Sequence, residues 1–373
     1  MIPQEDYELE GMIPNVIFPT GALTENGKLY IYYGAADTTC AMAMCDLDEL
    51  LDDLKKNPEI PRLNKYNQNP IISPRPELKW ESRATFNPAV IYLNNKVHLV
   101  YRAMGEENTS VFGYAASNDG MTISERPEEP VYAPSESFEL KLKPEGYSGC
   151  EDPRLTQIGD RIYMCYTAYD GINPPRIAMS SIYVNDFLNK KWNWAKPKLI
   201  SKPGVDNKDG CIFPEQINGK YVFCHREGGK GIVIDYLDDL EFEHGEYLES
   251  DMCLMLGSSS WDDLKIGVSA PPIKTKAGWL LLYHGVSKND QNYRVGAMLL
   301  DLKDPCRIIG RSQYPLLEPE LNYEKFGEVN NVVFPCGAVV IKDKIYVYYG
   351  GADKVIGMAQ GSLEEIVKDL SRE

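Results

Sequence analysis

Carboxylate, amide, guanidinium and imidazole side chains recur at corresponding places of a repeated sequence pattern. In each repeat a turn-forming residue, a short strand, a polar turn and an apolar-aromatic strand follow one another, which is the signature of a β-hairpin. Such side chains suit a sugar ring, whose hydroxyl groups need donors and acceptors, together with an anion held by arginines. The residues at these places are Asn87, Arg102, Asp152, Arg154, Glu215, His225, Arg226, His284 and Asp353.

The elements that must position these side chains are β-sheets. The repeats begin at Phe86, Glu151, Phe213, Ala270 and Phe334. Their spacing averages about 60 residues, which is long enough for a four-stranded antiparallel sheet with its loops. Five such sheets around one axis predict an all-β fold, a five-bladed β-propeller, in which the inner strand ends converge on a central funnel. An irregular pair of β-sandwiches is the alternative.

The beginning of the chain repeats its end. Residues 15–37 and 331–353 align without a gap and share 13 of 23 residues, and a helical pattern follows each copy, at 46–56 and 362–373. We therefore predict an N-terminal module, residues 1–56, that duplicates the last blade as an extra hairpin and helix. Residues 57–373 are predicted to form the five-bladed catalytic domain.

Three arrangements of this module are open: a sixth blade, an appended module, or a competitor of the closing blade in the same chain or in a neighbour. Closure of a five-bladed ring favours the appended module. A hairpin alone is marginally stable, so the module must dock, and a homo-oligomer through it is possible. Asp37 duplicates Asp353 but is not expected to be catalytic.

Composition excludes several classes of partner. A net charge of −16 disfavours nucleic acid and anionic membrane surfaces, because both would repel the chain. The start of the chain has no signal-peptide pattern and no apolar stretch reaches the roughly 20 residues that cross a bilayer, so a soluble cytoplasmic protein is expected. Nine cysteines without CxxC pairs indicate reduced thiols, and four histidines without a close pair indicate no metal site.

An ordered series of motifs resembles glycoside hydrolase family 130, the β-mannoside phosphorylases and related mannosidases. The resemblance covers about residues 64–373 and includes "ESRATFNPAV", "VYRA", "EDPRL", "FPEQINGKY", "HRE", "GWLLLYHGV" and "YYGGAD". It implies a five-bladed propeller that cleaves a β-linked mannoside with inorganic phosphate, inverts the anomeric carbon and releases α-mannose 1-phosphate. Phosphate would be a co-substrate, and no cofactor is implied.

The resemblance also implies roles for individual residues. Asp152 would be the general acid and would deliver its proton through a sugar hydroxyl. The phosphate-side residues would be Ser82, Arg83, Arg154, His284 and Gln216, and the sugar-side residues Asn87, Arg102, Arg226 and Asp353. A phosphorylase needs only the acid, because phosphate is already nucleophilic, whereas an inverting hydrolase needs a second carboxylate to activate water.

Gln216 departs from the family pattern, in which a lysine is expected after Phe-Pro-Glu. A neutral amide contributes no charge to phosphate binding, so the enzyme could instead use water, with Glu215 as the candidate base. A non-catalytic sugar-binding propeller is a further alternative. The linkage, β-1,2 or β-1,4, and the acceptor sugar stay open.

Overall fold

The chain divides into two compact units. The computed structural model describes residues 3–56, 61–229, 231–243, 245–250 and 253–371. One unit spans Met1–Ile60 and the other Pro61–Glu373. The domain junction predicted after residue 56 adjoins residues 57–60, which lie outside the described residues.

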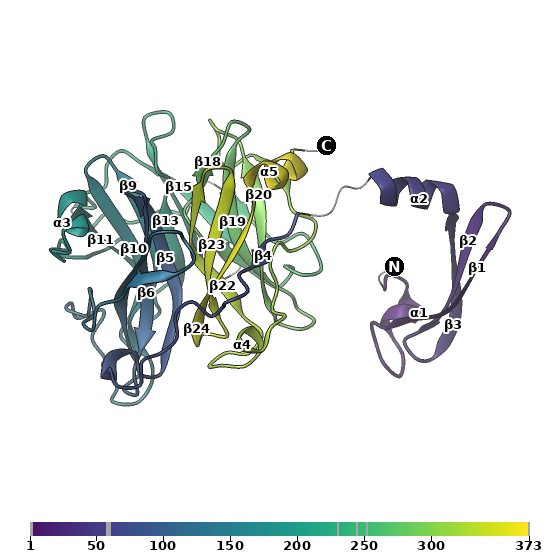
Figure 1. Cartoon of the computed structure of the whole chain (residues 1–373), viewed down its shortest axis with the longest axis horizontal. Coiled ribbons are helices and arrows are strands. Elements are labelled where there is room, and N and C mark those ends of the chain that lie inside the picture. Colours follow the sequence, from purple (N-terminus) through teal and green to yellow (C-terminus); the bar gives the residue numbers. More distant parts are fainter. Residues whose placement is uncertain (1–2, 57–60, 230, 244, 251–252, 372–373) are drawn as a thin grey trace. The chain divides into compact units, whose positions relative to one another are not determined.

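The N-terminal unit is a three-stranded antiparallel sheet in the order β1-β2-β3, with two helices (Figure 1). Asn26 and Gly27 both have positive φ in the β1–β2 turn, the backbone that a two-residue hairpin requires. The elements are α1 (Asp6–Leu9), β1 (Ile17–Glu25), β2 (Lys28–Ala35), β3 (Thr39–Asp46) and α2 (Leu47–Lys56).

The C-terminal unit consists of antiparallel strand groups in sequence order. The strand β4 (Asn64–Lys65) comes first in the sequence but pairs with the last group. The first group follows the 3-10 turn η1 (Lys79–Glu81) and consists of β5 (Ala84–Leu93), β6 (Lys96–Met104), β7 (Thr109–Ser117) and β8 (Ile123–Glu125). The second is β9 (Ser148–Ile158), β10 (Arg161–Tyr169), β11 (Arg176–Tyr183), α3 (Val184–Leu188) and β12 (Lys198–Leu199). The third is β13 (Asn207–Ile212), β14 (Tyr221–Glu227), β15 (Ile232–Leu237) and β16 (Cys253–Met255).

Two further groups complete the unit. The fourth is β17 (Lys265–Val268), β18 (Ile273–Lys274), β19 (Trp279–Val286), β20 (Tyr293–Leu300) and β21 (Ile308–Arg311). The fifth, which we call the closing group, is α4 (Asn322–Lys325), β22 (Val333–Ile341), β23 (Lys344–Gly351), β24 (Val355–Ser362) and α5 (Leu363–Leu370). The first two groups are joined into one eight-stranded sheet by a short parallel pairing of β7 with β9, which the sequence did not predict.

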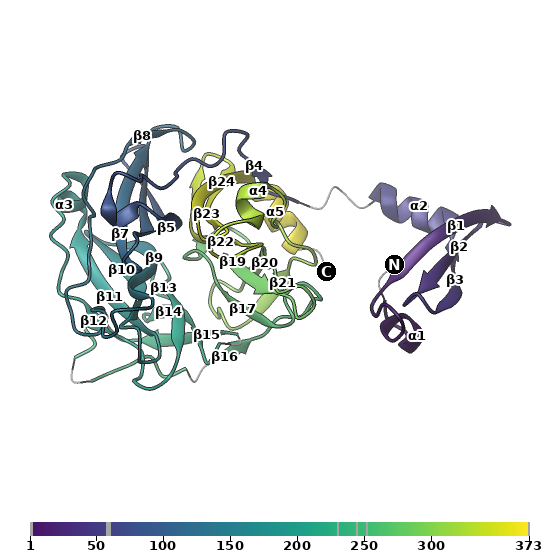
Figure 2. The same cartoon turned by 90° about the horizontal axis from the view of Figure 1, so that it is seen from below.

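The hydrophobic core lies between the groups. Five clusters of buried side chains each connect consecutive groups, for example Cys165 of β10 with Phe223 of β14. The last of them joins the closing group back to the first, through Tyr348 and Met358 against Val90. The groups therefore follow one another around the unit and return to their start, as Figure 2 also shows.

A recurring hydrogen bond fastens each group. The second long strand carries a tyrosine or histidine that bonds a buried carboxylate, and we call this pair a clasp. Tyr349 donates to Glu324 Oε1 at 2.8 Å, and its hydroxyl also meets that of Tyr323. The other clasps are Tyr101–Glu81, Tyr166–Glu139, His225–Asp235, Tyr283–Asp262 and, in the N-terminal unit, Tyr33–Glu8.

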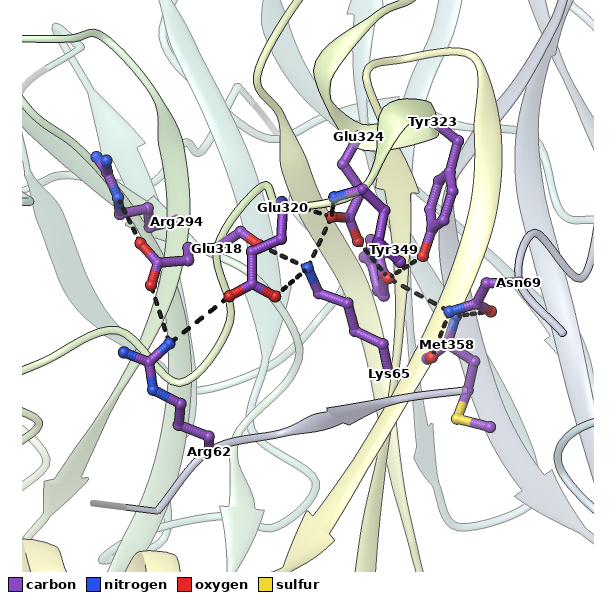
Figure 3. Close-up of polar contacts among 11 residues, drawn as sticks. Arg62, Lys65, Asn69, Arg294, Glu318, Glu320, Tyr323, Glu324, Tyr349 and Met358 are labelled. Carbon is purple, nitrogen blue, oxygen red and sulfur yellow. Dashed lines mark hydrogen bonds and ion pairs between the residues drawn. The ribbon is translucent and has the colours of Figure 1, made fainter. Parts of the chain in front are cut away.

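The first residues of the C-terminal unit complete the closing group. β4 pairs with β24, with Lys65 opposite Ala359. Lys65 Nζ lies 2.7 Å from Oε2 of the buried Glu324, and Asn69 exchanges hydrogen bonds with the backbone of Met358 (Figure 3). A strand from near the start of this unit thus secures its end.

Among the described residues, no helix is long and apolar enough to cross a membrane. In the same part of the chain, no group of three or more His, Cys, Asp or Glu side chains is arranged to hold a metal ion. Seven described cysteines are free thiols. Cys306 is disulfide-bonded, so the expectation of reduced thiols is wrong there.

Candidate active site

A polar cavity of about 300 Å³ collects side chains from all five strand groups and from the loops that precede two of them. Its lining includes charged groups of both signs, a combination that suits a sugar and an anion together. Its lining residues are Asn87, Arg102, Glu151, Asp152, Asp206, Lys208, Asp209, Arg226, Lys265, Tyr293, Val329, Val332, Phe334 and Asp353.

One backbone irregularity presents three of these side chains. In β5, β9 and β13 the register skips two residues, so that each strand carries a bulge opposite the clasp residue of its partner. Asn87, Asp152 and Asp209 occupy the first bulge position, with φ of 45°, 52° and 60°. Asn and Asp tolerate this left-handed backbone better than other side chains, and a bulge re-aims a side chain at a functional site.

Asp152 is held by two donors. Asn87 Nδ2 donates to Asp152 Oδ1 at 2.9 Å, and Arg102 Nη1 donates to the same oxygen at 3.1 Å. Arg102 Nη2 also binds Glu151 Oε1 at 2.8 Å. Burial alone would raise the pKa of Asp152, but the Arg102 charge and the Asn87 hydrogen bond outweigh it and hold the pKa below its usual value. The free site therefore keeps Asp152 ionised at neutral pH.

Asp353 has the opposite protonation. It lies in the β23–β24 turn, where Ala352 and Asp353 both have positive φ. Burial and the negative charge of Asp152 raise the pKa of Asp353 to about 7, although Arg102 opposes them. The cavity thus contains an ionised and a largely neutral carboxyl group at pH below 7, set apart by their environments.

A buried ion-pair network lies beneath Asp152. Arg154 donates to the backbone oxygens of Val268 at 2.7 Å, Ser269 at 2.9 Å and Asp152 at 3.0 Å. Asp209 accepts from Arg154 at 3.3 Å and from Arg226 Nε at 2.7 Å. Burial would raise the pKa of Asp209, but the Arg226 and Arg154 charges and the Arg226 hydrogen bond lower it. Arg154 therefore fixes the backbone at Asp152 and does not line the cavity.

His284 also lies behind the cavity wall. Its ring packs 4.5 Å from the Phe334 ring, and its Nε2 is 3.7 Å from Asp209 Oδ2. Burial lowers the pKa of His284 to about 3, so the ring is neutral. Neither ring nitrogen has a hydrogen-bond partner within the described part of the chain.

Two lysines of the cavity lack a close carboxylate partner. Lys208 Nζ is 3.9 Å from Glu151 Oε2, and Lys265 Nζ donates to the Tyr293 hydroxyl at 2.6 Å. Among the described residues, no ion pair of Lys265 and no shorter one of Lys208 is present. These two ammonium groups are therefore the cations in the cavity that an incoming anion can best engage.

The structure brings together five of the predicted site residues. They are Asp152 with the four predicted sugar-side residues, Asn87, Arg102, Arg226 and Asp353. It does not bring the predicted phosphate-side residues to the cavity wall. Arg154 and His284 are fully buried behind it. Ser82 and Arg83 are outside it, with Arg83 paired to Glu328 and Ser82 bonded to the Lys79 carbonyl.

Glu215 and Gln216 lie at the wrong end of their hairpin for a role in the cavity. Lys208 pairs with Arg226 at the cavity end of β13–β14, and Ile212 pairs with Phe223 at the other end. The turn that carries Gln216 follows Ile212, so it leads away from the site. Glu215 is exposed and ion-paired with Lys274. The structure therefore places Gln216 and Glu215 away from the cavity, and their roles as phosphate ligand and base stay predictions.

Sequence reasoning missed several cavity residues. They are Glu151, Asp206, Lys208, Asp209, Lys265 and Tyr293. A signal for one of them was available, because "NKDG" places Asp209 before a glycine as "FNPA" places Asn87 and "EDPR" places Asp152 before a proline. The matching bulges confirm that these three positions correspond.

Comparisons with known proteins agree on one family. The sequence model of glycoside hydrolase family 130, described as β-1,4-mannooligosaccharide phosphorylase, matches residues 1–57 and 53–372. The β-1,2-mannobiose phosphorylase of Thermoanaerobacter sp. (strain X514) is 41% identical over 322 residues, 82% of this chain and 99% of that protein. A 1,2-β-oligomannan phosphorylase of the same organism is 38% identical, with the same shares covered.

A comparison with a solved structure indicates the same family. The β-1,2-mannobiose phosphorylase from Listeria innocua, in complex with β-1,2-mannobiose, superposes with a TM-score of 0.69 and 28% identity, over 83% of this chain and 99% of that one. The match extends over nearly the whole length of each of these relatives. The chain therefore belongs to glycoside hydrolase family 130 and is an enzyme of the glycoside phosphorylase type.

Proposed function

We propose that this enzyme cleaves a β-mannoside by phosphorolysis, with inversion, and releases α-mannose 1-phosphate. The observation that carries this proposal is one cavity in which Asp152 stands with two lysines, Lys208 and Lys265, that have no close carboxylate partner. A phosphorylase needs an acid and an anion site rather than an acid and a base. Glu215, the candidate base of a hydrolase, lies outside the cavity, so hydrolysis with Glu215 as the base gains no support from the geometry.

In the proposed reaction, a phosphate oxygen attacks the anomeric carbon while the bond to the leaving sugar breaks. The electron pair of that bond moves to the leaving oxygen, which takes a proton from a sugar hydroxyl, and Asp152 gives its own proton to that hydroxyl. Phosphate held by Lys208 and Lys265 would be positioned and would need no base. Arg226, held by Asp209 at 2.7 Å, extends the same positively charged wall.

The protonation of Asp152 would follow from substrate binding. In the free site Arg102 and Asn87 keep Asp152 ionised. A phosphate anion nearby disfavours a second negative charge, so its arrival raises the pKa of Asp152. Asp353, whose pKa is raised to about 7, can in its protonated form donate a hydrogen bond to a sugar hydroxyl. Asn87 and Arg102 complete the proposed sugar side.

For the substrate we propose a β-1,2-linked mannobiose or oligomannan. The two relatives at 41% and 38% identity are both named for β-1,2-linked substrates, whereas the family description names a β-1,4-linked one. The solved relative from Listeria is likewise named for β-1,2-mannobiose.

For the architecture we propose that the five strand groups of residues 61–373 are the blades of a β-propeller. The five clusters between consecutive groups, the last returning to the first, support this arrangement. The cavity, which receives residues from all five groups, would then be the central funnel.

The test is incubation with β-1,2- and β-1,4-mannobiose, with and without phosphate, with mannose and mannose 1-phosphate quantified separately. The proposal expects mannose 1-phosphate only when phosphate is present, and faster from the β-1,2 disaccharide. Free mannose at the same rate without phosphate would refute phosphorolysis. Faster cleavage of the β-1,4 disaccharide would refute the linkage alone.

A further inference from the structure

The N-terminal unit repeats the closing group contact by contact. In both, the pairing of the first two strands slips at a proline: Pro19 is opposite Tyr33 and Gly21 opposite Tyr32, as Pro335 is opposite Tyr349 and Gly337 opposite Tyr348. The second and third strands keep one register throughout in both. The structure therefore extends the sequence repeat to identical strand pairing.

The repeat includes the clasp and the turn before it. Glu8 accepts from the Tyr33 hydroxyl at 2.6 Å and from the backbone of Gln4 and Glu5. Glu324 accepts in the same way from Tyr349, Glu320 N and Leu321 N. One partner differs: Glu324 also binds Lys65 (Figure 3), whereas no lysine pairs with Glu8 within the described residues. The N-terminal unit is thus a complete blade that lacks only the strand that fastens the closing group.

The two copies differ in what covers them. Phe18 is 63% exposed and its counterpart Phe334 8%; Tyr32 is 45% exposed and Tyr348 0%. Met42 is 49% exposed and Met358 0%. An isolated sheet with apolar side chains open to water is unfavourable and marks an interaction surface.

The closing group shows which surfaces cover the counterparts of these exposed side chains. Tyr348 and Met358 pack on Val90 and Leu99 of the first group. On the opposite face of the sheet, Val347 packs on the fourth group. The edge of β24 is paired by β4. These three surfaces form one socket, and they fit the N-terminal unit because it carries Ile31, Tyr32 and Met42 at the corresponding positions in the same register.

The copy also reproduces the cavity wall. The closing group contributes Val329, Val332, Phe334 and Asp353 to the cavity. The corresponding residues of the N-terminal unit are Ile13, Val16, Phe18 and Asp37. Ala36 and Asp37 have φ of 48° and 52°, as Ala352 and Asp353 have 46° and 51°, so the carboxyl group is presented by the same turn.

We propose that the N-terminal unit is a second closing blade that occupies this socket in a second copy of the chain, where Asp37 takes the place of Asp353. The closing group of that copy leaves as one continuous segment, because only the chain before α4 connects it to the rest. Exchange of an identical element between copies is a low-cost route to a dimer. Lys65 of the second copy then pairs with Glu8.

The exchange also changes the cavity rim. Glu328, which pairs with Arg83, corresponds to Met12 in the N-terminal unit. In the exchanged dimer Arg83 therefore loses its carboxylate partner and becomes available to an anionic ligand.

The test is disulfide trapping. Asn64 is opposite Gln360 in the β4–β24 pair, and Met44 is the counterpart of Gln360. The full chain with Met44→Cys and Asn64→Cys, in a background with Cys40→Ser and Cys45→Ser, is oxidised and run on a non-reducing gel. The matched control replaces Met44→Cys by Glu25→Cys, at the far end of β1. The proposal expects at least about tenfold more covalent dimer than the control. Equal amounts in both, or a cross-link only within single chains, would overturn it.

A second measurement follows Asp37. The specific activity of Asp353→Asn should rise with protein concentration, as exchange brings Asp37 into the cavity, and that of Asp353→Asn with Asp37→Asn should not. The activity measurement rests on the proposed role of Asp353, whereas the disulfide trapping does not. Failure of the proposed function can therefore be distinguished from failure of the proposed exchange. Equal concentration dependence in both variants would overturn the role of Asp37.

Discussion

At the scale of single residues, backbone geometry fixes the position of Asp152, the proposed proton donor. Asp152 stands on a bulge at φ 52° and its carbonyl is bonded by the buried Arg154. Side-chain and main-chain atoms of Asp152 are thus positioned independently, by Arg102 and Arg154. Such double fixation is what a proton donor needs, because rates fall steeply with small misplacements.

Replacement of Asp152 by Asn should remove the proton donor and leave the hydrogen-bonding shape. We expect kcat on β-1,2-mannobiose to fall by about 10²–10⁴-fold, the usual contribution of a general acid, with the disaccharide still bound. Initial rates and a binding titration measure the two effects. Glu215→Gln is the matched control and should keep wild-type activity. An Asp152→Asn enzyme of normal turnover would exclude Asp152 as the acid.

Replacement of Lys208 by Met should weaken phosphate binding. The change removes one charge-assisted hydrogen bond, worth about 1.5–3 kcal/mol, so KM for phosphate should rise about tenfold to a hundredfold. Phosphate saturation curves for Lys208→Met and Gln216→Ala make the comparison. The Gln216 variant should match the wild type because its turn leads away from the cavity. The reverse order of effects would restore the site suggested by the sequence.

Asp353 should make stability depend on pH. Its pKa rises from 3.8 in the unfolded chain to about 7 in the folded one, so the neutral form is favoured on folding. The stabilising contribution is complete below the unfolded pKa and is lost as pH rises to about 7, by at most about 1.4 kcal/mol per pH unit. Urea unfolding of wild type and Asp353→Asn between pH 4 and 8 measures this. Parallel curves for the two proteins would contradict the raised pKa.

Part of this site could be predicted from the sequence, because some of its residues lie beside recognisable turns or near strand ends. Asn87, Asp152 and Asp353 stand beside turn signals that a reader can compare between repeats, and Arg102 and Arg226 lie within two residues of the ends of their strands. Lys265 and Tyr293 reach the cavity from strands whose order around the unit depends on tertiary packing. Arg154 and His284 are polar residues that the sequence cannot assign to the wall or to the layer behind it.

At the scale of elements, the clasp explains how a two-residue strand can secure a group. β4 contributes few ladder bonds, but Lys65 neutralises Glu324, which is fully buried. Without a cation, that carboxylate would still accept from Tyr349 and two backbone amides but would remain charged in a dry environment, which is costly.

Lys65→Met should therefore destabilise the C-terminal unit by about 3 kcal/mol, the cost of breaking a buried ion pair. Arg62→Met removes an exposed ion pair with Glu318 from the same segment and should cost less than about 1 kcal/mol. Urea unfolding of both variants supplies the comparison. Equal losses of unfolding free energy in the two variants would contradict the claim that β4 stabilises the closing group by neutralising Glu324.

The strands themselves were predictable, but their joining was not. Hairpin turns such as Asn94-Asn95 and Asn218-Gly219 have the positive φ values that their residue types favour. The parallel pairing of β7 with β9 involves residues separated by a long loop, so no local pattern indicates it.

At the scale of the whole molecule, one sequence repeat has two different environments. The closing group is buried between two neighbours and contributes to the cavity, whereas its N-terminal copy carries the same face open to water. The sequence predicted the copy and its elements from local identity. The surface that would cover this copy cannot be predicted from local sequence, because the residues that cover the closing group lie in strands far from it in the chain.

The central claim is that phosphate, rather than water, attacks the mannosyl carbon. The most direct measurement is ¹H and ³¹P NMR of the purified enzyme turning over β-1,2-mannobiose in phosphate buffer, recorded from the first minutes. We predict that α-mannose 1-phosphate appears in step with free mannose, one for each disaccharide cleaved. Accumulation of two free mannose molecules per disaccharide, with no new phosphate ester signal, would contradict the account.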